Sequence, residues 1–147
     1  MWIEPIYDRT LADVEEIRNN PFSSNTKGAF NYFDLNRIEK NTIYVADLFR
    51  QVYGFSLNLK TKTNWNKKEI PTINDINRIR NNVLKISEEI NIDGFNEIEF
   101  SKTMNYTKAN ILEKNLLLIK NALENYKNNG IPIIGSIGLD SSLDIPL

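Results

Sequence analysis

One stretch of sequence occurs three times in this chain. It reads NYFDLNRIEKN at Asn31–Asn41, TINDINRIRNN at Thr72–Asn82 and NYTKANILEKN at Asn105–Asn115. Each copy begins with a residue type that caps helices, and apolar residues follow four and seven positions later. Further apolar residues continue at helical spacing beyond each copy. The repeat therefore predicts three amphipathic helices that bury their apolar stripes against one another.

Polar residues mark where each predicted helix begins. The capping residues are Asn31, Thr72 and Asn105. Asp34 and Asp75 stand three positions after their caps, where a carboxylate faces the positive end of the helix dipole. These five residues are therefore assigned a structural role.

A weaker copy of the same signal lies near the N-terminus. Thr10 and Asp13 fit a capping box, and Val14 and Ile17 form a short apolar side. Pro21 predicts where this helix ends. The sequence therefore predicts a fourth, shorter helix before the three repeats.

An Asn recurs at the fifth position after each cap, as Asn36, Asn77 and Asn110. This position lies at the border of the apolar stripe, and two interpretations are open. The amides are solvated, or they bond to a neighbouring segment and lock the helices in place. A buried amide without partners costs about 1–3 kcal/mol, so burial would require such bonds. Either role is structural. The Asn at the tenth position lies on the opposite flank, and in the first interpretation it is solvated as well.

The connecting segments favour extended structure. Ser56–Thr63 alternates apolar and polar residues, which predicts a half-buried strand. Trp2–Tyr7 is extended in composition, and Pro5 limits it to an edge strand or an arm. Ile98 and Phe100 could form a second short strand.

The expected fold is therefore mainly α. It is an antiparallel three- to four-helix bundle with a small β-hairpin or short strands in the connectors. Residues 1–130 form this domain. Residues 131–147 are rich in Gly and Pro, lack a helical period, and are expected to form an extended C-terminal arm.

Composition limits the chemistry that this chain could perform. It has no His, no Cys and a net charge of -1. An enzyme of this composition would have to use carboxylates, Lys, Tyr or hydroxyl groups. The charge balance does not favour nucleic acid, and no apolar run is long enough to span a bilayer. We therefore expect no catalytic residues, cofactor, metal site, nucleic-acid partner or membrane span.

Trp65 lies among four lysines, Lys60, Lys62, Lys67 and Lys68. Basic residues around an aromatic ring can bind single-stranded nucleic acid or an anionic glycan. The alternative is a strand whose lysines face solvent and protect an edge, with Trp65 buried under the turn. Both interpretations remain open at this stage.

The aromatic run at the start of the second predicted helix and the apolar ends of the chain could contact a partner. An arm that adds a strand to a neighbouring sheet would bind through main-chain hydrogen bonds. The candidate partner-binding residues are Trp2, Ile3, Tyr32, Trp65, Ile133, Ile134 and Ile137.

Four separated blocks carry a resemblance to a known family. They are W-I-x-P-x-x-D-R-T-x-A-D-V (Trp2 to Val14), K-G-A-F-N-x-x-D-L-N-R-I-E-x-N (Lys27 to Asn41), K-T-x-W-x-x-x-x-I-P-T (Lys62 to Thr72) and N-Y-x-x-A-N-x-x-E (Asn105 to Glu113). Over roughly residues 2–126 the chain resembles small structural proteins and domains of tailed phages and prophages of Firmicutes. These are usually encoded among tail, baseplate and fibre genes. The resemblance implies no catalytic residue.

The resemblance leads us to expect a non-enzymatic component of a phage tail or baseplate. It would be made in the host cytoplasm and reside in the virion tail, in several copies set by the particle's symmetry. Its partners would be other tail or baseplate proteins, and attachment of a fibre or receptor-binding protein is one such role. Trp2–Tyr7 and Ile131–Leu147 would be docking arms.

Two other functions remain open. One is a cell-wall glycan or receptor-binding module that uses the region of Trp65. The other is a carboxylate-based wall hydrolase, which the missing His and the lack of a plausible acid pair disfavour.

Overall fold

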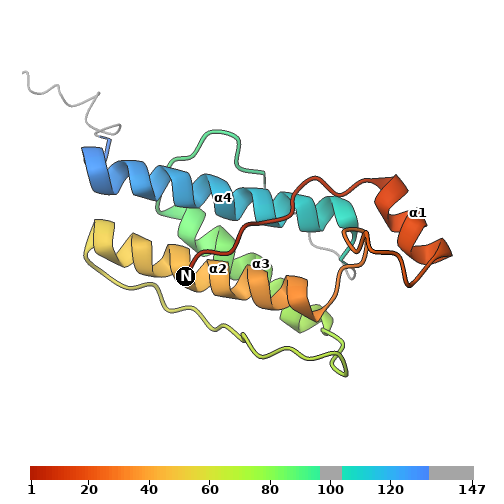
Figure 1. The fold of residues 1–147 in the computed structure, drawn as a ribbon. Coiled ribbons are helices and arrows are strands. Elements are labelled where there is room, and N and C mark those ends of the chain that lie inside the picture. The colour runs from red at the N-terminus through yellow and green to blue at the C-terminus, as the bar shows by residue number, and fades with distance from the viewer. Residues whose placement is uncertain (97–103, 133–147) are drawn as a thin grey trace, which may run out of the picture.

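The computed structural model describes residues 1–96 and 104–132, and in this part of the chain it contains four helices and no strand. They are α1 (Leu11–Asn19), α2 (Tyr32–Tyr53), α3 (Ile73–Glu88) and α4 (Tyr106–Asn129) (Figure 1). The prediction of one short and three longer helices is confirmed.

Local sequence signals set the helix ends. Thr10, Asn31 and Thr72 each form a complete capping box with the Asp three positions later. Asn105 caps α4 by accepting from the backbone N–H of Lys108, without an acidic partner. Gly54 ends α2 in the left-handed conformation, with a φ of 82° that favours glycine.

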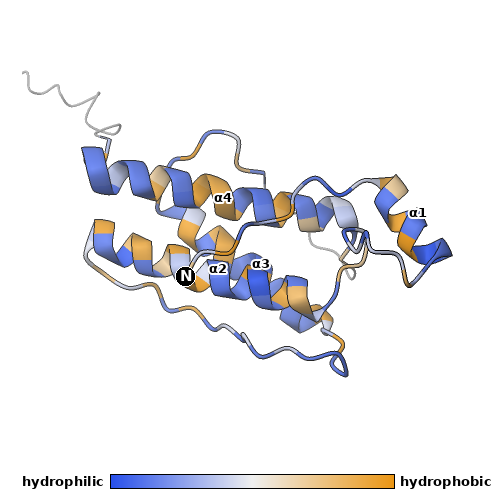
Figure 2. Ribbon diagram, in the orientation of Figure 1, coloured by the Kyte–Doolittle hydropathy of each residue, from blue (hydrophilic) through white to orange (hydrophobic). Residues whose placement is uncertain are grey.

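The core lies between α2, α3 and α4, and it contains the apolar stripes of all three. Figure 2 shows apolar and polar residues along each helix, as amphipathic helices require. α1 has no buried residue and is outside this core. The fold is therefore a three-helix bundle with one peripheral helix. The least exposed apolar side chains are Ile38, Val45, Phe49, Ile86, Ala109, Leu116, Ile119 and Leu123.

The three core helices run in the same direction, so the expected antiparallel arrangement is wrong (Figure 1). Arg37 near the start of α2 bonds to Glu113 near the start of α4. At the other end, Lys127 Nζ of α4 lies 2.7 Å from Gln51 Oε1 of α2.

Long connectors make this parallel arrangement possible. A helix the length of α2 is about 33 Å long, and an extended chain advances about 3.3 Å per residue. About ten extended residues can therefore return the chain to its starting end, and residues 54–72 exceed that number.

The predicted strand at Ser56–Thr63 is also wrong, because this segment pairs with no strand among the described residues. It is nevertheless extended along the bundle, and Leu57 and Leu59 pack against the core. The alternation of apolar and polar residues therefore indicated an extended chain with one face on an apolar surface. Such a chain need not belong to a sheet. Ile98, Phe100 and residues 133–147 lie outside the described residues.

Candidate functional site

The N-terminal arm, residues 1–10, lies in a groove between α2 and α4, which we call the arm groove. Asn41 of α2 accepts from Ile3 N at 2.9 Å and donates to Ile3 O at 2.7 Å. Asn110 of α4 does the same with Arg9, at 3.0 Å and 2.9 Å. Each amide thus satisfies both polar backbone groups of one residue, as a neighbouring strand would. We call this arrangement an Asn clamp.

A buried charge cluster completes the arm groove. Glu113 Oε1 accepts from the backbone N–H of Ile6 at 3.0 Å, between the two clamps. One guanidinium nitrogen of Arg9 lies 2.8 Å from both Asp34 Oδ1 and Glu113 Oε2. The other terminal nitrogen donates to Ile6 O at 2.6 Å. Arg9 is only 3% exposed, so its charge depends on these carboxylates.

A second arginine balances the charge of this cluster. Arg37 Nε lies 2.6 Å from Glu113 Oε1, and Arg37 also pairs with Asp34. Burial opposes the charged form of Arg37, but hydrogen bonds and charge attraction from Glu113 and Asp34 outweigh it and raise the pKa of Arg37. Two cations and two anions therefore share one buried site with no net charge.

The connector between α2 and α3 occupies a second groove, between these two helices, which we call the connector groove. Asn36 of α2 clamps Trp65, with bonds of 2.8 Å to its N and 2.9 Å to its O. Asn82 of α3 donates to Lys60 O at 2.7 Å. Glu39 accepts from the backbone N–H of Lys62 at 2.8 Å, between these two contacts.

The ion pair of the connector groove joins α3 to α2. The two terminal nitrogens of Arg78 lie 2.6 Å and 2.8 Å from the two oxygens of Glu39. The bond to Glu39 raises the pKa of Arg78. A bidentate arginine–carboxylate pair fixes geometry as well as charge.

Trp65 belongs to the connector groove and to the core. It is 5% exposed, and its Nε1 donates to Glu39 Oε1 at 3.1 Å. The ammonium of Lys62 lies 4.4 Å from the ring centroid. The structure thus places Trp65 under the turn, and its ring is not available to a glycan or to another partner.

The two grooves use the same positions of the repeat. In both, the fifth-position Asn and the eighth-position Glu come from one helix, and the sixth-position Arg and the tenth-position Asn come from the next. A third pair of helices shows part of this pattern, because Asn115 of α4 clamps Asn96, at 3.1 Å and 2.7 Å. Asn77 on α3 is half-buried, like Asn36 and Asn110, and makes no such clamp among the described residues.

Sequence reasoning missed the tenth-position residues. Neither interpretation gave Asn41, Asn82 and Asn115 a bonding role, but they are 0%, 8% and 2% exposed. The buried role of Glu39 and Glu113 was missed as well. Recurrence at a fixed phase of the repeat was the available signal for all of them.

Two other candidate partner residues, Trp2 and Ile3, belong to the arm in the arm groove. Trp2 is half-buried, with its ring centroid 5.7 Å from that of Tyr44. The sequence led us to expect a docking arm at this end of the chain. In the structure Asn41 holds Ile3, so the arm is bound to its own bundle. Tyr32 is half-buried at the start of α2. The candidates of the C-terminal arm, Ile133, Ile134 and Ile137, lie outside the described residues.

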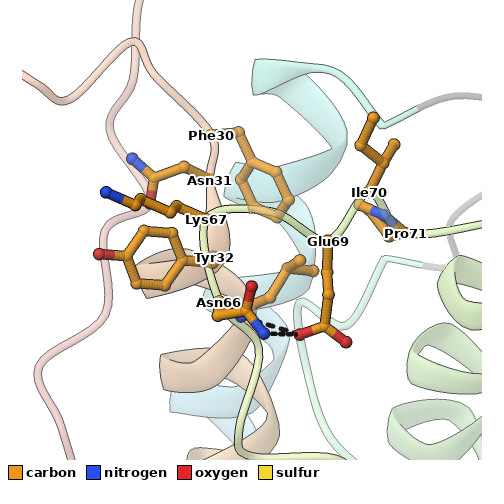
Figure 3. Close-up of a pocket in the computed structure, with 9 residues that line it drawn as sticks. Phe30, Asn31, Tyr32, Asn66, Lys67, Glu69, Ile70 and Pro71 are labelled. Carbon is orange, nitrogen blue, oxygen red and sulfur yellow. Dashed lines mark hydrogen bonds between the residues drawn. The ribbon is translucent and has the colours of Figure 1, made fainter.

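An open cleft of about 380 Å³ lies between the start of α2 and the turn before α3 (Figure 3). Its lining mixes aromatic, aliphatic and polar residues. They are Phe30, Asn31, Tyr32, Leu35, Asn66, Lys67, Glu69, Ile70 and Pro71.

Within residues 1–96 and 104–132, no group of three or more acidic side chains is placed to hold a metal ion. No helix in the same ranges is long and apolar enough to cross a bilayer. Comparisons of the chain with protein-family models, with curated proteins and with solved structures found no match.

Proposed function

We propose that this chain is a non-enzymatic structural component of a phage tail, baseplate or tail-like particle, and that it acts by assembly with other virion proteins. The observation that carries the proposal is how the motif residues are used. Charged and amide side chains of the blocks that resemble the phage family bind one another and the chain's own extended segments. Arg9, Glu39 and Glu113 are at most 3% exposed. The motif therefore supports a scaffold, and contacts with partners fall to the outer surface.

Exposed apolar side chains near the starts of α2 and α3 support such contacts. Phe33 is 63% exposed, Ile70 is 87% exposed and Ile73 is 39% exposed. Exposed apolar residues that gather in one region are typical of protein interaction sites. On this proposal the protein is made in the host cytoplasm and is present in the virion tail in several copies. One role there is to attach a fibre or a receptor-binding protein.

Cross-linking of purified particles, from the strain that encodes the chain, tests the proposal. We expect the chain in the particles in several copies, with cross-links from Lys67 or Lys68 to another virion protein. The double variant Phe33→Ser, Ile70→Ser should reduce its incorporation, whereas Leu11→Ser, 54% exposed on α1, should not. Absence of the wild-type chain from the particles would contradict the proposal.

The two other functions lack a supporting observation in the described residues. A glycan site at Trp65 requires an accessible ring, and this ring is buried. A carboxylate hydrolase requires a pair of carboxylates that a substrate can reach. The most buried glutamates, Glu39 and Glu113, are each paired with arginine.

A further inference from the structure

We propose that the connector between α2 and α3 presents a free strand edge, and that residues 137–147 of a second copy of this chain bind there as an added strand. The site lies over the outer face of α2 and uses different residues from the exposed apolar group at the starts of α2 and α3. The inference goes beyond the function proposed above, because it concerns a contact between copies of the purified chain. It holds whether or not the chain is found in particles.

The outer face of α2 is the floor of an open trough, which we call the outer trough. In Figure 1 the arm runs along one side of α2 and the connector along the other, and these two segments are its walls. Two adjoining hollows, of about 530 Å³ and 250 Å³, share Ile43 and Asp47 of the floor. Ile43 is 45% exposed, and Leu57 and Leu59 of the connector line the same trough. The outer trough therefore offers apolar surface beside an extended backbone.

The bundle occupies one edge of the connector, through backbone groups of even-numbered residues. Asn58 O and Lys60 O accept hydrogen bonds from side chains of α3, at 3.1 Å and 2.7 Å. Lys62 N donates to Glu39 of α2 at 2.8 Å. In an extended chain, successive residues direct their N–H and C=O groups to opposite edges. The groups of the odd-numbered residues therefore face away from these contacts.

The other edge of the connector has no partner in the described part of the chain. It is formed by the odd-numbered residues Leu57, Leu59, Thr61 and Thr63, all of which line the outer trough. No hydrogen bond to their backbone N–H or C=O groups is made by any described residue. A row of unpaired backbone groups is a template for a further strand. A partner that adds one binds mainly through main-chain hydrogen bonds.

The C-terminal segment has the sequence of a strand with one apolar side. It lies outside the described residues, so the pattern is taken from the sequence. From Ile137 to Leu147 the odd-numbered residues are apolar except Ser141, and the even-numbered ones are Gly, Asp, Ser, Asp and Pro. Such alternation is typical of a strand that is buried on one face. Bound at the free edge, the apolar side of this strand covers Ile43.

Strand direction favours a second copy over the same chain. Lys127 near the end of α4 bonds to Gln51 near the end of α2, and the connector begins at this same end. A chain's own C-terminal segment therefore enters the trough where the connector begins and runs parallel to it. Residues 133–136 span about 13 Å, too little to pass a connector wall, residues 57–63, that is about 20 Å long. Antiparallel pairs are the more stable per residue, and a second copy can form one.

One antiparallel register matches the two sequences. It places Ser141, the polar residue on the apolar side of the segment, opposite Thr61. Asp140 and Asp144 then lie diagonally on either side of the exposed Lys60, within reach of its long side chain. The segment carries no Lys or Arg that would repel this side chain. Sequence pattern and charge therefore select the same pairing.

Cysteine cross-linking tests the contact, since the chain has no Cys of its own. Full-length Thr61→Cys chains mixed with Ser141→Cys chains should form a disulfide-linked heterodimer on air oxidation, because the two positions are opposite each other on one face of the ladder. The matched control is Thr107→Cys, at an exposed Thr of α4. Mixed with Ser141→Cys, it should form at least about tenfold less heterodimer.

Sedimentation equilibrium of the purified wild-type chain tests association without a cross-link, with an expected Kd between about 1 µM and 1 mM. The double variant Leu139→Ser, Leu143→Ser changes the apolar side of the segment and should weaken association at least about tenfold. Ser142→Ala changes the other side and should associate as the wild type does.

Four outcomes would overturn the proposal. The wild type stays monomeric up to about 1 mM, or the Thr107→Cys control cross-links as well as Thr61→Cys does. The double variant Thr61→Cys, Ser141→Cys closes its disulfide within one chain, or the leucine variant associates as the wild type does. None of these outcomes affects the incorporation of the chain into particles through the starts of α2 and α3.

Discussion

The arm groove and the connector groove hold extended chain through the same positions of the repeat, and they differ at the last clamped residue. That residue is Arg9 in the arm groove and Trp65 in the connector groove. Arg9 brings a second cation to Glu113 and Asp34, whereas Trp65 brings an indole N–H to Glu39 and a large apolar ring to the core. The Asn clamp thus binds backbone and accepts either side chain.

The neighbouring helix decides which side chain fits. In the arm groove, Asp34 of α2 is buried and faces Arg9. The equivalent acid on α3, Asp75, is partly exposed and bonds to its own cap, Thr72. In the arm groove the buried cation of Arg9 is stabilised by two carboxylates. Among the described residues of the connector groove no second carboxylate is buried, and the apolar ring of Trp65 fills the site. The two grooves should therefore respond differently to loss of their side chains.

The largest effect is expected from Glu113→Gln in the arm groove. This change leaves Arg9 and Arg37 to share the single charge of Asp34, and breaking a buried ion pair costs about 3–5 kcal/mol. Urea denaturation should show this loss in the free energy of unfolding. Glu124→Gln, which removes the partly exposed pair with Lys120 on the same helix, should cost less than about 1 kcal/mol. Equal losses in the two variants would mean that the cluster does not hold the arm.

The stability of the connector groove should depend more on the packing of the Trp65 ring than on its hydrogen bond to Glu39. Trp65→Ala should cost about 3–5 kcal/mol, because it leaves a cavity in the core. Trp65→Phe keeps an aromatic ring but removes the donor to Glu39, and it should cost about 1–3 kcal/mol. Thermal and urea unfolding of both variants measure the difference. A Phe variant as unstable as the Ala variant would show that the indole N–H, rather than packing, dominates this groove.

A single Asn clamp should contribute less than either of these groups. Asn41→Ala removes both bonds to the backbone of Ile3 and should cost about 1–3 kcal/mol, because the arm loses its first attachment. The control is Asn121→Ala, at an exposed position of α4, which should change stability by no more than about 0.5 kcal/mol. If the two variants unfold at the same urea concentration, Asn41 does not act as a clamp.

The smallest effect concerns the capping box of α3. Hydrogen bonds from the backbone N–H and hydroxyl of Thr72 lower the pKa of Asp75 below its ordinary value of 3.8. Because the pKa of Asp75 is lowered in the folded state, its ionised form stabilises the fold at any pH above about 3.8. This stability is lost as the pH falls through the folded-state pKa. An exposed site of this kind is worth about 0.3–1 kcal/mol.

Unfolding measured at pH 6 and again below pH 3 tests the cap. Asp75→Asn should lower stability at pH 6 and match the wild type more closely in acid. A constant difference between the two proteins over this range would contradict an ionised cap.

Sequence predicted the helices because caps and apolar periodicity are local signals. Asn31, Thr72 and their stripes act within one helix, so no knowledge of neighbours is needed. Helix direction could not be predicted in this way, because an apolar stripe packs equally well in either direction. The length of the connector at residues 54–72 was the available clue.

The site was harder to predict because its contacts join residues far apart in the chain. Asn110 binds Arg9, and Asn36 binds Trp65. The repeat indicated that the fifth-position Asn residues are equivalent, but it did not identify what they bind. Alternation at Ser56–Thr63 suggested a sheet because an extended chain that packs one face on an apolar surface, here through Leu57 and Leu59, has the same pattern as a half-buried strand.

Hydrogen exchange of backbone amides in the arm tests the clamps most directly. The clamps and Glu113 hold the N–H groups of Ile3, Ile6 and Arg9, a spacing of three residues. We therefore expect slow exchange at these three amides and fast exchange at Glu4, Tyr7 and Asp8. Slow exchange at every second residue, as in a strand of a sheet, or fast exchange along the whole arm, would contradict a chain held by the side chains of parallel helices.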